Sequence, residues 1–268
     1  MSEGSPYAGD TAIVFGGTSG IGAATALLLA ERSPAVTVVS RREPEGEATA
    51  ERCRAAGAAA QYVAGDVTDD GQVAAAVATA TRAHGPLTMA VNSAGTDVSA
   101  PFTDLTDADV ATLFLINTEG LWRCVKHEIA AMVETGRGSI VNVNSIASLV
   151  PVLGNSLYGA SKNAVTGITQ SAAYEYAAAG IRVNETAPGT TRTQVLEDFL
   201  AQSTGDTVTA EQLARCVALA IWPNLGSRPR PSPSSCRTTP RSSPARRCPS
   251  TEHEQPVSAD ETCVAGSR

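Results

Sequence analysis

Short runs of β-branched and apolar residues alternate with longer alanine-rich stretches from residue 11 to about residue 222. The pattern predicts strands over residues 11–15, 36–40, 61–64, 87–92, 139–143 and 181–185, and helices over residues 21–32, 45–56, 70–84, 107–134, 156–179 and 194–201. Strands that alternate with helices pair in parallel through right-handed crossovers. Several of these strands are apolar throughout, as strands covered on both faces are. The sequence therefore predicts an α/β fold with a doubly wound parallel sheet.

The length and the composition fit one such domain. A chain of 268 residues suits a single core, which we place at residues 11–222 after an extension at residues 1–10. No apolar run approaches the roughly 18 residues of a membrane helix, and the N-terminus lacks a secretory segment, so we expect a cytoplasmic protein. The net charge of −7 disfavours nucleic acid as a partner. The six cysteines contain no C-x-x-C pair, so we expect reduced thiols and no metal site.

The composition changes after Trp222. Residues 223–250 contain seven prolines, seven serines and six arginines, and no acidic residue. This composition predicts a disordered tail over residues 223–268. A solvated linker and a basic arm for an anionic partner are both compatible with it.

A glycine-rich turn joins the first predicted strand to the first predicted helix. Its residues are Gly16, Gly17, Thr18, Ser19, Gly20, Ile21 and Gly22. Glycines let the backbone approach a pyrophosphate closely, and the helix N-terminus supplies free N–H groups and a partial positive charge. The G-x-x-x-G-x-G spacing differs from the commoner G-x-G-x-x-G. A turn that merely needs positive φ is the alternative, but its place between strand and helix favours a dinucleotide site.

Polar and small residues follow the next three predicted strands. Arg41 and Arg42 stand where an acidic residue would bind the ribose hydroxyls of NAD. A guanidinium suits a 2′-phosphate, so NADP(H) is favoured and NAD(H) is the alternative. Asp66 and Val67 follow the third strand, where Asp can accept from the adenine amino group. Asn92, Ala94 and Gly95 follow the fourth strand, where small residues let the backbone lie along the cofactor.

Tyr158 and Lys162 are four residues apart in a predicted helix, so they share one face. A neighbouring ammonium lowers the pKa of a phenol, which makes the tyrosine usable as a general base. Lys162 is one of only two lysines, which weakens the alternative of an ordinary surface pair. Ser145 follows the fifth strand, where parallel sheets bind ligands, and its hydroxyl could hold a substrate oxygen. Asn117 lies inside a long predicted helix, where it is either a kink or water relay, or a neutral helix residue.

The chain resembles the short-chain dehydrogenase/reductase family over about residues 11–193. The matching features are the glycine turn, Asp66, residues 92–95, Asn117, Ser145, Tyr158, Lys162 and Pro188-Gly189. The resemblance implies a Rossmann-type fold and hydride transfer between a nicotinamide cofactor and a carbonyl or secondary alcohol. It implies that Tyr158 is the acid/base, that Lys162 lowers its pKa and holds the nicotinamide ribose, that Ser145 orients the substrate oxygen and that Asn117 supports a proton relay.

The resemblance also implies that Pro188, Gly189, Thr191 and Thr193 contact the cofactor, that residues 194–201 form a substrate lid, and that the protein is a homo-oligomer. Phe15 departs from the family, which usually has threonine there.

The larger departure is C-terminal, where the family normally ends with a strand that resembles F-V-T-G-x-x-L-x-V-D-G-G. Residues 242–252 can be encoded so that the same bases, read one nucleotide earlier, give F-V-T-G-A-A-L-P-V-D-G. We hypothesise that the reading frame shifted between about residues 212 and 227, which sequencing of the gene would test.

The sequence thus predicts an NADP(H)-preferring oxidoreductase that interconverts a ketone and a secondary alcohol. The alternative is a nucleotide-binding relative with weak or no catalysis, because the usual last strand is missing. A third hypothesis is an interaction protein that uses its basic tail.

Overall fold

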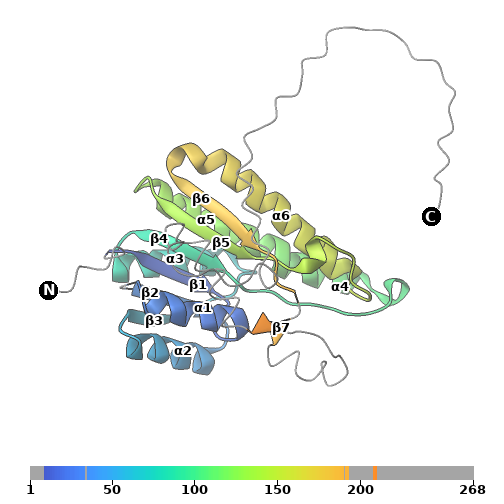
Figure 1. Cartoon of the computed structure of the whole chain (residues 1–268), viewed down its shortest axis with the longest axis horizontal. Helices are drawn as coiled ribbons and strands as arrows, with labels where there is room; N and C mark the ends of the chain where they lie inside the picture. Colours follow the sequence, from blue (N-terminus) through green and yellow to red (C-terminus); the bar gives the residue numbers. More distant parts are fainter. Residues whose placement is uncertain (1–8, 34, 190, 193–207, 210–268) are drawn as a thin grey trace, which may run out of the picture.

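The computed structural model describes residues 9–33, 35–189, 191–192 and 208–209, and in them a parallel sheet forms the centre of the molecule (Figure 1). Its order is β3-β2-β1-β4-β5-β6. The strands are β1 (Thr11–Phe15), β2 (Ala35–Ser40), β3 (Ala59–Ala64), β4 (Leu87–Asn92), β5 (Gly138–Val143) and β6 (Ile181–Thr186). The order reverses between β1 and β4, and a doubly wound sheet binds its ligand at such a point. The predicted Rossmann-type α/β fold is confirmed.

Helices cover both faces of this sheet. They are α1 (Gly20–Ala30), α2 (Glu43–Ala55), α3 (Asp70–His84), α4 (Asp107–Phe114), α5 (Leu121–Val133) and α6 (Ser156–Tyr176). Successive side chains of a strand point to opposite faces. Ala12 and Val14 of β1 therefore pack with α1 and α2, whereas Ile13 and Phe15 pack with α3, α5 and α6. The site at the strand ends is thus supported by two hydrophobic cores.

The predicted bounds of β1, β4 and α3 agree with the structure, and the other strands, α1 and α2 differ from prediction by one or two residues. The prediction of one continuous helix over residues 107–134 is wrong. A π-helical turn, η2 (Leu115–Gly120), separates α4 from α5. Its last residue packs closely on the core, since a Cβ at Gly120 would lie 2.8 Å from a methyl carbon of Val67. Such turns occur often at functional sites.

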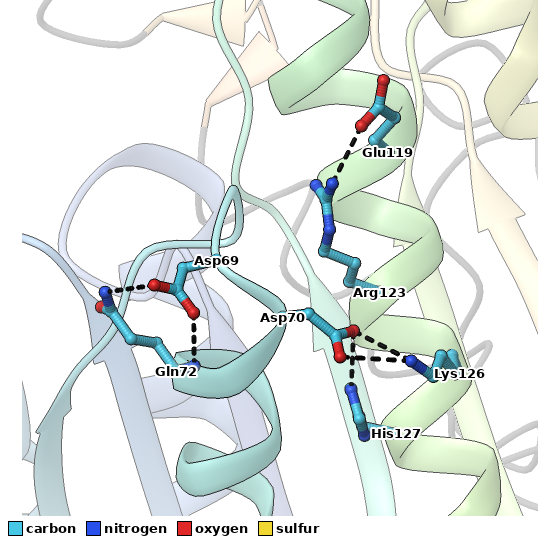
Figure 2. A network of polar contacts seen from close by, with 7 residues as sticks. All are labelled: Asp69, Asp70, Gln72, Glu119, Arg123, Lys126 and His127. Atoms are coloured by element: carbon cyan, nitrogen blue, oxygen red, sulfur yellow. Dashed lines mark hydrogen bonds and ion pairs between the residues drawn. The ribbon is translucent and has the colours of Figure 1, made fainter.

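A surface network joins the start of α3 to α5 (Figure 2). Asp70 accepts a hydrogen bond from Lys126 Nζ at 3.0 Å, and its Oδ1 lies 2.9 Å from His127 Nε2. Asp69 caps α3 by accepting from the Gln72 backbone N–H at 3.0 Å. The exposed ion pairs contribute little to stability, whereas a cap of this kind is typically worth about 1 kcal/mol.

Several predictions fall outside the described residues. They are Thr193, the lid helix at 194–201, residues 1–8 and the tail at 223–268, so the domain limits and the frame-shift hypothesis stay predictions. Two short strands, β7 (Thr191–Arg192) and β8 (Val208–Thr209), pair in parallel. In the part of the chain that the structure describes, no helix has the length and apolar character needed to span a membrane.

Candidate active site

The residues predicted for the site gather at one edge of the sheet, because the carboxyl ends of parallel strands lie together. The glycine turn follows β1, Arg41 follows β2, Asp66 follows β3, Asn92 ends β4, Ser145 follows β5 and Pro188 follows β6. The edge therefore brings together groups from six strands that are far apart in the sequence.

The glycine turn between β1 and α1 needs glycine because of its backbone angles and its close contacts. Gly16 and Gly20 have φ values of +75° and +51°, in the region that glycine favours. A Cβ at Gly16 would lie 2.5 Å from the backbone nitrogen of Ala94, and one at Gly22 would collide with the carbonyl oxygen of Gly16. Ser19, the N-cap of α1, makes no side-chain capping hydrogen bond. The helix start is thus available to an anion, and the turn fits a dinucleotide pyrophosphate.

Arg42 reaches this turn from the end of β2. Its Nη2 donates to Ser19 Oγ at 3.2 Å and to Thr18 Oγ1 at 3.4 Å. Arg41 Nη1 lies 3.8 Å from Asp66 Oδ2, so the arginine pair borders the mouth of the turn.

The side chains of two predicted cofactor residues also contribute to the hydrophobic core, and their contact with the cofactor stays a prediction. Val67 is buried beneath Gly120 of η2, and Ile21 packs partly buried on the α1 side of the sheet.

The segment after β4 is fixed from both sides. The backbone N–H of Ser93 donates to the carbonyl oxygen of Phe15 at 2.9 Å, which ties the ends of β1 and β4 together through the backbone. On the other side, Asn117 Oδ1 accepts from the Thr96 N–H at 2.9 Å, and its Nδ2 donates to the Thr96 carbonyl oxygen at 2.8 Å. Asn117 Nδ2 also donates to Ser161 Oγ at 3.1 Å. The buried Asn117 side chain thus clamps the loop to α6, a role that its position in the sequence did not indicate.

The Ser145 hydroxyl lies close enough to the Tyr158 phenol to affect its ionisation. Burial raises the pKa of the Tyr158 phenol above its ordinary value near 10, the Ser145 hydroxyl lowers it, and the nearby Asp97 carboxylate raises it. Ser145 Oγ also accepts from the Ala147 N–H at 3.2 Å, and the Ile146 N–H donates to the Pro188 carbonyl oxygen at 2.8 Å. These bonds hold the serine between the ends of β5 and β6.

Lys162 lies beneath the tyrosine and is only 6% exposed. Its Nζ is 5.7 Å from the centroid of the Tyr158 ring and donates to the Val143 carbonyl oxygen at 3.0 Å. Burial lowers the pKa of Lys162 to about 8, although the Glu185 carboxylate opposes this effect. A Cβ at Gly95 would lie 3.7 Å from Nζ and 3.2 Å from Asn117 Oδ1. A hydroxyl, a phenol and an ammonium therefore meet beside the glycine of the β4 loop.

The sequence matches the short chain dehydrogenase family over residues 10–204. The chain belongs to the short-chain dehydrogenase/reductase family. It is 42% identical over 189 residues to the cis-4-hydroxycyclohexanecarboxylate dehydrogenase of Sinomonas cyclohexanicum. The aligned region covers 69% of this chain and 75% of that protein. As a member of this family, the protein is an oxidoreductase of the alcohol/carbonyl class.

Two similar solved structures contain different cofactors. An actinorhodin polyketide ketoreductase with NADPH has a TM-score of 0.74 and 30% identity, covering 80% of this chain and 90% of its own. An NAD⁺-bound xylitol dehydrogenase has a TM-score of 0.75 and 26% identity, covering 81% and 93%. Membership of the family therefore implies NAD(P) and leaves the choice between the two to residues of this chain.

Sequence reasoning missed a group of polar residues that supports the site of this family member. Asn144 Nδ2 donates to Thr166 Oγ1 and to Glu185 Oε2, both at 2.9 Å, and Thr166 Oγ1 donates to Glu185 Oε1 at 3.1 Å. The available signal was the asparagine at every second position of the otherwise apolar segment 140–144. Asp97 carried no such signal, because only its position near Tyr158 in space makes it relevant.

Proposed function

We propose that this protein interconverts a ketone and a secondary alcohol with NADP(H) and that Tyr158 is the acid/base. The observation that carries the proposal is that the buried Lys162 lies 5.7 Å from the centroid of the Tyr158 ring, while the Ser145 hydroxyl lies near the phenol. A bound nicotinamide supplies or accepts the hydride in this chemistry.

The side chains of Ser145, Tyr158, Lys162 and Asn117 have different roles in the proposed reaction. Ser145 and Tyr158 offer two O–H groups to one substrate oxygen, which orients the carbonyl and polarises it. During reduction, the phenolic proton of Tyr158 moves to that oxygen, and during oxidation the phenolate takes it back. Burial opposes formation of the phenolate. We propose that the positive charge of Lys162, 5.7 Å from the ring centroid, favours it. Asn117 supports this arrangement by fixing the Thr96 loop and Ser161.

The preference for NADP(H) rests on Arg42 and Arg41. The Arg42 guanidinium already donates to Thr18 and Ser19 in the turn that suits the pyrophosphate, so it lies within reach of a 2′-phosphate. Arg42→Ser should weaken NADPH binding at least about tenfold, a typical loss for one charged contact, and leave NADH binding nearly unchanged. Titration of both cofactors by fluorescence measures this. A wild-type protein that binds NADH more tightly than NADPH would contradict the preference.

The acid/base role is tested with NADPH and a panel of ketones that includes the ketone corresponding to 4-hydroxycyclohexanecarboxylate, in view of the Sinomonas relative. Tyr158→Phe should reduce turnover by about 10²–10⁴-fold and leave NADPH binding intact. Tyr174→Phe is the matched control, because Tyr174 is an exposed tyrosine of the same helix. Full turnover by Tyr158→Phe would refute the role. NADPH binding without turnover in the wild type would favour the alternative of a nucleotide-binding protein that is catalytically weak.

We also propose that the enzyme is a cytoplasmic homo-oligomer with a small-molecule substrate. The exposed aromatic side chain of Trp122 on α5 supports association with a second copy. Light scattering of the purified protein measures the assembly, and a monomer at all concentrations would contradict it.

A further inference from the structure

A chain of buried polar side chains crosses the core between α5 and α6. Glu128 of α5 and Asn142 of β5 are both 0% exposed, and Asn92 of β4 lies between them. Asn92 Nδ2 donates to Glu128 Oε2 at 2.9 Å and to Asn142 Oδ1 at 3.0 Å. Asn142 Nδ2 then donates to Thr169 Oγ1 at 2.9 Å, and this hydroxyl donates to the Val165 carbonyl oxygen at 2.8 Å.

Two polar atoms of this network of side chains have no hydrogen-bond partner. They are Asn92 Oδ1 and Glu128 Oε1, both fully buried. Each is an acceptor when the glutamate is ionised, so neither can satisfy the other. Rotating the Asn92 amide by half a turn would not help, because its oxygen would then face Glu128 Oε2 and Asn142 Oδ1, which are also acceptors. The network therefore fixes the orientation of the Asn92 amide and lacks one hydrogen-bond donor between Asn92 Oδ1 and Glu128 Oε1.

A single proton on Glu128 supplies both missing partners. A carboxylic acid and a carboxamide are planar groups whose two polar atoms are similarly spaced. The hydrogen bond from Asn92 Nδ2 to Glu128 Oε2 therefore favours an arrangement in which Glu128 Oε1 faces Asn92 Oδ1. We propose that Glu128 is held as a neutral carboxylic acid whose Oε1–H donates to Asn92 Oδ1, and that this acid–amide pair positions the cofactor-binding residues 93–95.

The surroundings of Glu128 favour the neutral form. Burial raises its pKa to about 8, and the hydrogen bond from Asn92 only partly opposes this. The titratable groups on its own and neighbouring elements are Arg123, Cys124, Lys126 and His127 on α5, Glu119 on η2, Asp70, Arg82 and His84 on α3, Tyr158, Lys162, Tyr174, Glu175 and Tyr176 on α6, and Arg182 and Glu185 on β6. None of these is among the causes of its shift. An ionised Glu128 would thus be a buried charge with no cation to compensate it, which is strongly unfavourable.

The pair connects to the cofactor turn through the backbone. Asn92 is the last residue of β4, and the next residue, Ser93, donates from its backbone N–H to Phe15. Ala94 lies against Gly16 with no room for even a Cβ between them. Ionisation of Glu128 would replace the O–H···O contact by repulsion between two acceptors and would release the proton to solvent. Any resulting shift of Asn92 would move the backbone against the glycine turn, so Glu128 is a positioning residue.

The test uses Glu128→Gln, which keeps the shape and both hydrogen bonds of the pair but cannot ionise. Infrared spectra of the wild type at pH 7 should contain the C=O band of a protonated carboxyl group that Glu128→Gln lacks. This band should disappear as the pH rises through about 8. If only the protonated form is competent, the wild-type Kd for NADPH relative to that of Glu128→Gln should rise about tenfold between pH 7 and pH 9.

Lys162 titrates over the same range but is present in both proteins, so the ratio of the two Kd values isolates Glu128. Glu134→Gln is the matched control, because Glu134 is exposed at the end of the same helix and should leave band and Kd as in the wild type. The infrared titration of the wild type needs no variant and tests protonation by itself. A wild type without the acid band at pH 7 would overturn the proposal, as would identical pH profiles for wild type and Glu128→Gln.

Discussion

Replacing Lys162 by methionine should stabilise the protein at neutral pH while removing a group of the proposed active site. Methionine has a similar length and no charge, so it can occupy the same buried space. The lysine is 6% exposed and its pKa falls from 10.5 to about 8 because burial disfavours the charged form. This variant therefore separates the stability of the fold from the needs of catalysis.

The magnitude follows from the two pKa values. At about 1.4 kcal/mol per pH unit, holding the charged lysine in the folded state costs about 3 kcal/mol at pH 7. Methionine removes this cost but leaves the Val143 carbonyl oxygen without its donor, which costs about 1–2 kcal/mol. The net gain is about 1–2 kcal/mol, or an increase in Tm of about 2–8 °C.

The pH dependence provides the sharper assay. The folded pKa of Lys162 lies below the unfolded one, so between about pH 8 and pH 10.5 the unfolded chain binds more protons than the folded protein. Wild-type stability therefore rises with pH across this window relative to Lys162→Met. Urea unfolding at pH 7 and pH 9.5 should show the advantage of the variant shrink or reverse.

Lys126→Met is the control, since Lys126 is the only other lysine, lies half exposed and pairs with Asp70. It should bring no gain in stability at pH 7. A Lys162→Met protein that is less stable than the wild type at pH 7, or a difference that does not change with pH, would refute the reasoning.

Two further predictions concern backbone positions and caps. Gly22→Ala should weaken NADPH binding at least about tenfold and destabilise the fold by about 1–3 kcal/mol, because its Cβ would meet the Gly16 carbonyl oxygen. Gly167→Ala, in α6 with open space around it, should instead stabilise by about 0.5–1 kcal/mol, and thermal unfolding of both variants compares them. Thr106→Ala should cost about 1 kcal/mol in urea unfolding with kcat/KM unchanged, because Thr106 and Asp109 form a capping box at an exposed helix start. An equal loss from both glycine variants, or reduced activity of Thr106→Ala, would contradict these expectations.

The strands and the cofactor turn were predictable because their causes are local. Alternating or continuous apolar residues specify a strand within five or six positions, and β1 and β4 begin and end where the pattern indicates. A kink at Asn117 was one of the alternatives that the sequence allowed, and η2 includes this residue, but the contacts that stabilise the π-helical turn were not predictable from residues 107–134. The turn is stabilised by contacts of Asn117 with Thr96 and of Gly120 with Val67, which lie 21 and 53 positions away in the chain.

The sequence by itself determined the order of the strands and helices, the glycine turn and the spacing of Tyr158 and Lys162 on one helix face. Only the tertiary structure decided the ionisation of Lys162 and Glu128. The pKa of Lys162 depends on the burial that β5 and the β4 loop impose on it, and the pairing of Glu128 depends on Asn92, 36 residues earlier in the chain. Desolvation and hydrogen bonding act between residues that are neighbours in space. The pKa values of these side chains therefore could not be inferred from the sequence and follow only from the assembled sheet.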